Sequence, residues 1–84
     1  MFVQTLNTPN PNSLKFLPGE KVSLSGPLEF TEKNQTSNEL IRNILSVNGV
    51  TGIFISDDFL SVNKSSEKEW EDIKHIIISL INEY

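Results

Sequence analysis

A β-hairpin followed by a helix is encoded in VTGIFISDDFLSVNK (residues 50–64) and SSEKEWEDIKHIIISLINEY (residues 65–84). The first stretch is rich in β-branched and aromatic residues and is interrupted at residues 56–58, Ser-Asp-Asp, which are favoured in turns. Beyond that turn, Leu60 and Val62 alternate with polar neighbours, as they do in a half-buried strand. The pattern therefore predicts two antiparallel strands joined by a short turn.

The last segment changes to a helical period. Ser66 and Glu69 match a capping box, in which each side chain bonds to the backbone N–H of the other residue. Apolar side chains then recur every three or four residues on one face, namely Trp70, Ile73, Ile77, Leu80, Ile81 and Tyr84. Ile76 and Ile78 flank this stripe and widen the apolar surface. One flank of the predicted helix is therefore a candidate contact for a partner.

A second, shorter helix is predicted over residues 37–47. Thr36 and Glu39 match a capping box, and Gly49 is placed to form a left-handed cap at the C-terminal end. The apolar residues between these ends keep helical spacing, namely Leu40, Ile41, Ile44 and Leu45.

The N-terminal part of the chain predicts short strands, at residues 2–5, 13–17, 22–24 and 28–30. In the second of these, Leu14 and Phe16 share one face and Lys15 lies on the other. Pro27 indicates a sheet edge, because proline cannot donate a hydrogen bond to a neighbouring strand. Strands and helices in this order predict an α+β fold: a two-layer sandwich of a mainly antiparallel sheet, about four to five short strands, with two helices on one face.

The chain has 84 residues, no cysteine and a net charge of −4. This length supports one small domain over residues 1–84, and the missing thiols exclude disulfides, cysteine nucleophiles and cysteine-bound clusters. The basic residues are scattered, so we expect no nucleic-acid partner. The longest near-apolar run, residues 76–81, is far below the roughly 20 residues of a membrane span, and the N-terminus lacks a secretory pattern. We therefore expect no membrane partner and a cytoplasmic (bacterial cytosol) or organelle-matrix location.

Catalytic chemistry has little support in the sequence. His75 is the only histidine and lies about 160° from the centre of the apolar stripe, on the solvent side of the predicted helix. Asp57 and Asp58 are better explained as turn residues than as a metal site, because a hard cation needs about six oxygen ligands. No serine lies in a G-x-S-x-G turn. We predict no enzyme activity and no specific metal site, and leave weak, nonspecific iron association open.

The strongest candidate for a binding site is a polar loop with two prolines, made of Thr8, Pro9, Asn10, Pro11, Asn12 and Ser13. Each proline fixes its own φ and pushes the preceding residue towards an extended backbone, so the loop loses little entropy on ordering. The loop is either a stiff connector between strands or a recognition surface that offers its polar groups to a protein partner. In the second case Lys15 is a nearby charged donor.

Motifs along the whole chain point to a family. They are FVQT at residues 2–5, TPNPNSLKF at residues 8–16, Gly49-Val50 with Phe54, Asp58-Phe59 with Val62, and Trp70. In combination they resemble the N-terminal domain of the Nfu-type (NifU-like) iron-sulfur cluster scaffold and carrier proteins. In the fuller members of that family, a downstream domain carries a C-x-x-C pair that holds the cluster, and the 84 residues of this chain contain no such pair.

The resemblance implies a non-catalytic accessory domain that supports cluster delivery to target proteins. Its implied partners are iron-sulfur scaffold proteins, apo-target proteins or its own downstream domain. It further implies that the iron-sulfur cluster belongs to the C-x-x-C domain and that this chain binds no cofactor by itself. We expect the chain to be the N-terminal module of a longer protein. The alternative is a stand-alone protein–protein interaction adaptor with no iron-sulfur role, which would use the flank of the last helix or an exposed strand edge.

Overall fold

The computed structural model describes residues 3–18 and 27–84. Within them the elements are, in chain order, β1 (Gln4–Asn7), β2 (Ser13–Leu17), β3 (Leu28–Phe30), the 3₁₀ helix η2 (Lys33–Gln35), α1 (Glu39–Leu45), β4 (Val50–Ile55), β5 (Leu60–Lys64) and α2 (Trp70–Glu83).

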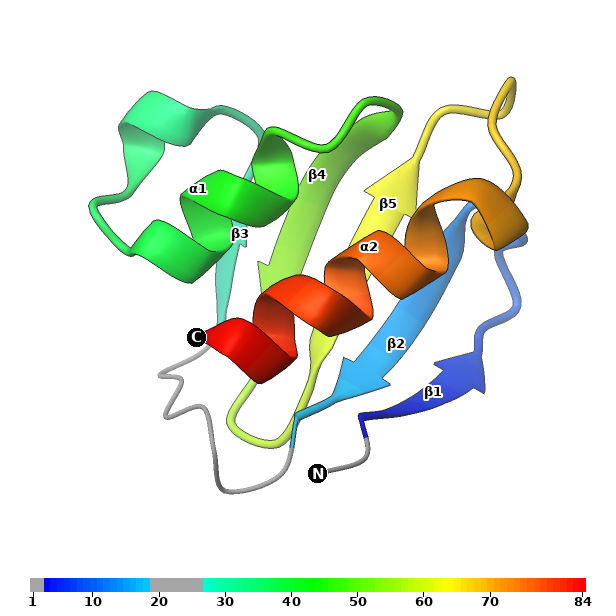
Figure 1. Ribbon diagram of the computed structural model, residues 1–84, viewed down its shortest axis with the longest axis horizontal. Coiled ribbons are helices and arrows are strands. Elements are labelled where there is room, and N and C mark those ends of the chain that lie inside the picture. Colours follow the sequence, from blue (N-terminus) through cyan, green and yellow to red (C-terminus); the bar gives the residue numbers. More distant parts are fainter. Residues whose placement is uncertain (1–2, 19–26) are drawn as a thin grey trace.

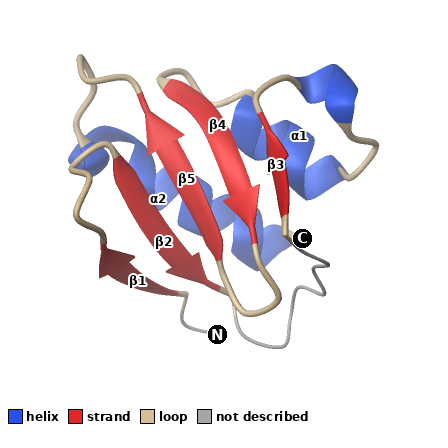
Figure 2. Cartoon of the chain, turned by 180° about the vertical axis from the view of Figure 1, so that it is seen from behind, coloured by secondary structure: helices blue, strands red, loops and turns tan. Residues whose placement is uncertain are grey.

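The strands form one sheet in the order β1-β2-β5-β4-β3, and every neighbouring pair is antiparallel. Both α-helices lie against the same face of this sheet (Figure 1). Seen from behind, the sheet stands in front of both helices and its other face is uncovered (Figure 2). The predicted two-layer α+β fold is therefore confirmed.

The core lies between the sheet and the helices. Strand alternation directs one set of side chains to the helices, namely Leu14, Phe16, Ile53, Ile55, Leu60 and Val62. The helices contribute the residues of their inner stripes, namely Leu40, Ile41, Ile44, Ile77 and Ile81. Each such side chain contributes about 1.5–3 kcal/mol when it leaves water, so this single layer is the main source of stability.

Within the described residues, the predicted strands agree with the structure except at the N-terminus. The first strand is Gln4–Asn7 rather than residues 2–5, because Gln4 to Asn7 pair in register with Leu17 to Leu14 of β2. The predicted strand at residues 22–24 lies outside the described residues. Pro27 directly precedes β3, which is an edge strand as predicted. The hairpin of β4 and β5 is confirmed, and its turn is closed by the bond from Ser56 N to Phe59 O at 2.9 Å.

The predicted start of α1 is wrong by two residues. The N-cap is Asn38, whose Oδ1 accepts a hydrogen bond from Ile41 N at 3.1 Å. Thr36 instead accepts a bond from Asn38 N and shapes the approach to the helix. The helix ends at Leu45 with Ser46 as its C-cap, and Gly49 has the predicted positive φ, 103°, but in the turn that leads into β4.

The predicted capping box of α2 is also wrong. The helix begins at Trp70 with Glu69 as N-cap, and the Glu69 side chain makes no capping bond. Ser65 N donates to Gly49 O at 2.7 Å, and the carbonyl of Ser65 accepts from Lys68 N. The segment before Trp70 therefore forms a turn that is bonded to Gly49, the residue directly before β4, and the helix begins after that turn.

The apolar stripe of α2 is largely as predicted. Ile73, Ile77 and Ile81 are buried, whereas Tyr84 at the end of the stripe is 51% exposed. Of the two flanking residues, Ile78 packs against the core and Ile76 is 39% exposed. The exposed part of the flank is therefore narrower than the sequence pattern indicates.

Candidate functional site

A line of side chains crosses the uncovered face of the sheet. Lys15 on β2 pairs with Ser61 on β5, and Ser61 pairs with Phe54 on β4. The line continues to the two edges, because Leu6 pairs with Lys15 and Glu29 pairs with Phe54. Lys15, Ser61 and Phe54 alternate with core residues, and Leu6 and Glu29 pair directly with two of them. All five therefore share the face that no helix covers (Figure 2).

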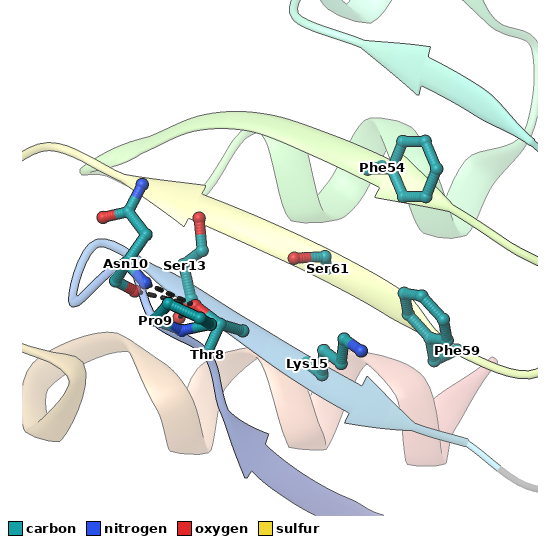
Figure 3. A pocket seen from close by; sticks show the side chains of 8 residues that line it. All are labelled: Thr8, Pro9, Asn10, Ser13, Lys15, Phe54, Phe59 and Ser61. Carbon is teal, nitrogen blue, oxygen red and sulfur yellow. Dashed lines mark hydrogen bonds between the residues drawn. The ribbon is translucent and has the colours of Figure 1, made fainter.

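A groove with a volume of about 380 Å³ lies on this face. We call it the open-face groove, and it is lined by Thr8, Pro9, Asn10, Ser13, Lys15, Phe54, Phe59 and Ser61 (Figure 3). The proline loop forms one end, the two phenylalanines form the other, and Lys15 and Ser61 lie between them. Sequence segments about fifty residues apart thus build one surface.

The ammonium group of Lys15 points towards the aromatic end of the groove (Figure 3). Its Nζ lies 4.4 Å from the centroid of the Phe59 ring, which is within the range of a cation–π contact. The ring of Phe54 lies 6.4 Å from that of Phe59, centroid to centroid. The Phe59 ring therefore contacts the cation, and the two rings together form an apolar wall next to it.

The loop of residues 8–13 is folded on itself by local hydrogen bonds. The Thr8 hydroxyl donates to Asn10 O at 2.8 Å and accepts from Asn10 N at 3.2 Å. The side-chain oxygen of Asn10 accepts from Asn12 N at 2.9 Å, and Asn10 O accepts from Ser13 N at 3.0 Å. These bonds are typical of an Asx turn within a β-turn, so the loop has one compact shape.

Two residues distant in sequence anchor the loop from the side opposite the groove. Lys64 Nζ donates to Asn12 Oδ1 at 2.9 Å, and Trp70 Nε1 donates to Pro11 O at 3.0 Å. The Lys64 side chain is only 8% exposed, and its ammonium lies 5.7 Å from the centre of the Trp70 ring. We call this pair the Lys64–Trp70 anchor.

The backbone and the neighbouring strand strengthen the same attachment. Lys64 N donates to Asn12 O at 2.8 Å, and the hydroxyl of Ser13 donates to Asn63 Oδ1. Trp70 in turn stands edge-on to the buried ring of Phe16, with centroids 6.3 Å apart. The loop is therefore connected directly to the core.

Comparison with known proteins identifies the family. Residues 3–84 match the family described as "Scaffold protein Nfu/NifU N terminal". The chain belongs to this family. NifU-like protein 4, mitochondrial, of Arabidopsis thaliana is 35% identical over all of this chain and 30% of its own length. The mitochondrial NFU1 iron-sulfur cluster scaffold homolog of Homo sapiens is 37% identical over all of this chain and 34% of its own length. The chain thus spans about a third of the length of these relatives.

Two solved structures have the same fold. The solution structure of a NifU-like protein from Saccharomyces cerevisiae superposes with a TM-score of 0.84 at 34% identity, covering 98% of this chain and 76% of that chain. The crystal structure of a Staphylococcus aureus protein superposes with a TM-score of 0.81 at 30% identity, covering 95% of this chain and 98% of that one.

In this Nfu/NifU N-terminal chain, the residues predicted for recognition divide into two groups. Those that line the open-face groove are Thr8, Pro9, Asn10, Ser13 and Lys15. Pro11 and Asn12 lie on the other side of the loop, where their oxygens accept bonds from Trp70 and Lys64. The hydroxyl of Ser13 and the side-chain oxygen of Asn10 are bonded inside the molecule, so the side-chain NH₂ of Asn10 and the ammonium of Lys15 are the better-placed polar groups for an external partner.

Sequence reasoning missed four residues of this site. Phe54 and Ser61 face the groove because each alternates with core residues on its own strand, a parity that is visible in the sequence. Lys64 has the same parity as Leu60 and Val62, which indicates an inward side chain. The position of Phe59, in the turn before β5, carries no such signal.

The other sequence candidates are not among the residues that line the groove, although Asp58 directly precedes the lining residue Phe59. His75 is exposed on α2, and Asp57 and Asp58 are exposed in the turn between β4 and β5. Residues 3–18 and 27–84 contain no group of three or more His, Cys, Asp or Glu side chains arranged to hold a metal ion. None of the helices in that part of the chain is long and apolar enough to span a membrane.

The indole N–H of Trp70 provides a test of the anchor. We expect Trp70→Phe to lower the free energy of unfolding by about 0.5–1.5 kcal/mol, the usual value of one hydrogen bond, and to speed amide hydrogen exchange at Asn12 and Ser13. The matched control is Tyr84→Phe, which removes a hydroxyl that accepts a long, solvent-exposed bond, 3.4 Å, from Asn38 Nδ2. Equal exchange rates at the loop in the wild-type and Trp70→Phe chains would show that the indole does not hold it.

Proposed function

We propose that this chain is a non-catalytic protein-interaction domain that supports iron-sulfur cluster delivery, and that it docks its partners at the open-face groove. The partners are iron-sulfur scaffold proteins, apo-target proteins or a cluster-bearing domain of the same protein. The proposal rests on one observation: the rigid loop of residues 8–13 and Lys15 converge on the sheet face that the helices leave uncovered. A surface ordered before binding loses little entropy when a partner docks.

Family membership and chemistry support this role. The human relative is named an iron-sulfur cluster scaffold homolog. Iron-sulfur clusters are held mainly by thiolates, and this sequence has no cysteine. We therefore propose that a C-x-x-C domain holds the cluster and that this chain, as the N-terminal module of a longer protein, contributes contacts. The mitochondrial relatives are consistent with an organelle matrix, and the bacterial cytosol is the other proposed location.

The test is an NMR titration of the ¹⁵N-labelled chain with a cluster-loaded C-x-x-C carrier domain. We expect chemical-shift changes at the groove, foremost at Thr8, Asn10 and Lys15, and little change along α2. The matched variants are Asn10→Ala, which we expect to weaken binding, and Ile76→Ser, which we expect to leave it unchanged. Shifts confined to α2 would remove the groove from the proposal.

The second candidate function is a stand-alone adaptor without an iron-sulfur role. It is favoured by Ile76, which is 39% exposed on the outer flank of α2. In the same titration, an adaptor of this kind would show no response to the cluster-loaded domain. Its binding to another partner would then be lost in Ile76→Ser and retained in Asn10→Ala.

A further inference from the structure

We propose that the open-face groove binds an extended acidic peptide segment, in which a carboxylate lies beside an aromatic or aliphatic side chain. This inference rests on the proposed function, because it specifies the chemistry of the partner segment at the same site.

The charge of the groove selects an anion. Lys15 is the only charged residue among the eight described residues that line it. The carboxylate of Glu29 shares the sheet face but stands three strands away, which at the usual strand spacing is about 14 Å. Among residues 3–18 and 27–84, the contact of the Lys15 ammonium is the face of Phe59, and no acceptor in that part of the chain takes its N–H groups.

The surroundings make that cation a good docking point. Lys15 is half-buried, so a carboxylate that reaches it leaves part of its hydration shell and is less screened than in an exposed surface pair. The Phe59 ring restricts the flexible lysine chain before binding, which lowers the entropy lost when an ion pair forms.

The rest of the lining selects an apolar neighbour for that carboxylate. Pro9, Phe54 and Phe59 provide the carbon surface of the groove, and the hydroxyl of Ser61 lies between them (Figure 3). A free carboxylate would leave these rings in water, whereas a segment with an adjacent aromatic or aliphatic side chain covers them.

The shape selects a peptide segment. The groove holds about 380 Å³, near the lower end of small-ligand sites, and it lies on the surface of a sheet instead of in a deep cleft. A few residues in extended form fit such a surface, with the loop of residues 8–13 at one end and Phe59 at the other.

The experiment uses three blocked peptides that differ only at two positions, with Glu-Phe-Glu, Gln-Phe-Gln or Lys-Phe-Lys between Gly-Ser flanks. Each is titrated into the ¹⁵N-labelled chain at low salt, and Kd is read from the shifts of Lys15 and Ser61. We expect the acidic peptide to bind about tenfold more tightly than the neutral one, which corresponds to about 1.4 kcal/mol, and the basic peptide to bind least.

Two lysine variants test whether the preference for the acidic peptide comes from the groove. Lys15→Gln should remove the preference for Glu over Gln, whereas Lys74→Gln, which makes the same charge change on α2, should keep it. Equal affinity for the acidic and neutral peptides, or a preference that survives Lys15→Gln, would overturn the inference. Both variants are compared by ¹⁵N spectra first, so that an unfolded sample is recognised.

The same samples separate this inference from the proposed function. If the cluster-loaded carrier domain shifts the groove but the acidic peptide shows no preference, the partner chemistry is wrong and the docking role stands. If the acidic peptide binds as expected but the carrier domain does not, the groove chemistry is supported and the role in cluster delivery fails.

Discussion

We expect Phe16→Ala to lower the free energy of unfolding by about 3–5 kcal/mol, the largest effect of any change considered for this chain. Phe16 is fully buried, with 0% of its surface exposed, and its side chain extends from β2 into the core between the sheet and α2. Replacing the ring with a methyl group removes its transfer free energy and leaves a cavity that the surrounding residues fill only in part.

The size of this loss matters because the domain is small. A chain of this length has a net stability of about 4–12 kcal/mol, so the variant is left with little or none. The ring also supports Trp70 by an edge contact at 6.3 Å between centroids. The loss of the Phe16 ring therefore weakens the support of Trp70, which anchors the loop of residues 8–13, in addition to leaving a cavity in the core.

The loss of unfolding free energy in Phe16→Ala is measured by unfolding the chain in urea. The fluorescence of Trp70, the only tryptophan, reports the unfolding. The control is Leu6→Ala on the neighbouring strand, where the side chain is 52% exposed and we expect a change within about 0.5 kcal/mol. If both variants unfold at the same urea concentration, Phe16 is not the centre of the core.

The second large effect is expected at Gly49, where Gly49→Ala should cost about 1–3 kcal/mol of unfolding free energy. Gly49 has φ of 103°, which L-residues with a Cβ rarely adopt. A Cβ at this position would also lie 2.6 Å from Cγ of Lys68, so that side chain would have to move.

Gly52→Ala is the matched control for Gly49→Ala. A Cβ built there meets Phe30 O at 3.4 Å, an ordinary contact, and we expect its stability to stay within about 1 kcal/mol of the wild-type chain. The double variant Gly49→Ala/Lys68→Ala removes the side-chain overlap and leaves the backbone strain, which separates the two causes. Thermal unfolding of the four chains gives the comparison, and equal stability of the two single alanine variants would contradict it.

Periodicity made the layers predictable from sequence. In the hairpin, strict alternation assigned Leu60 and Val62 to the core, and both are fully buried. In α2, spacing by three and four assigned Ile73, Ile77 and Ile81 to the inner face, and all three are buried. These positions follow from local chain geometry, which the sequence carries directly.

Helix starts were less predictable because several polar residues compete for the same role. Thr36 and Asn38 are both good N-caps, and the structure uses Asn38 because its side chain reaches Ile41 N. The start of α2 is set by a contact between residues distant in sequence. Ser65 N donates to Gly49 O, and the residues predicted to cap the helix form a turn instead.

The site was predictable only in part, because it too depends on contacts between residues that are distant in sequence. The stiffness of the loop follows from Pro9 and Pro11 alone, but the groove depends on the register that places Lys15 opposite Ser61 and Ser61 opposite Phe54. The burial of Lys64 likewise depends on its contacts with Asn12, which is distant in sequence, and with Trp70 on the following helix. No local pattern carries such pairings.

The anchoring of the loop orders events during protein synthesis. Pro11 and Asn12 leave the ribosome early, yet the groups that fix them, on Lys64 and Trp70, are translated more than fifty residues later. A nascent chain that ends before Trp70 therefore lacks the indole bond to the loop, even though every residue of the loop itself has been made. The polypeptide must therefore be synthesised as far as Trp70 before both attachments of the loop can form.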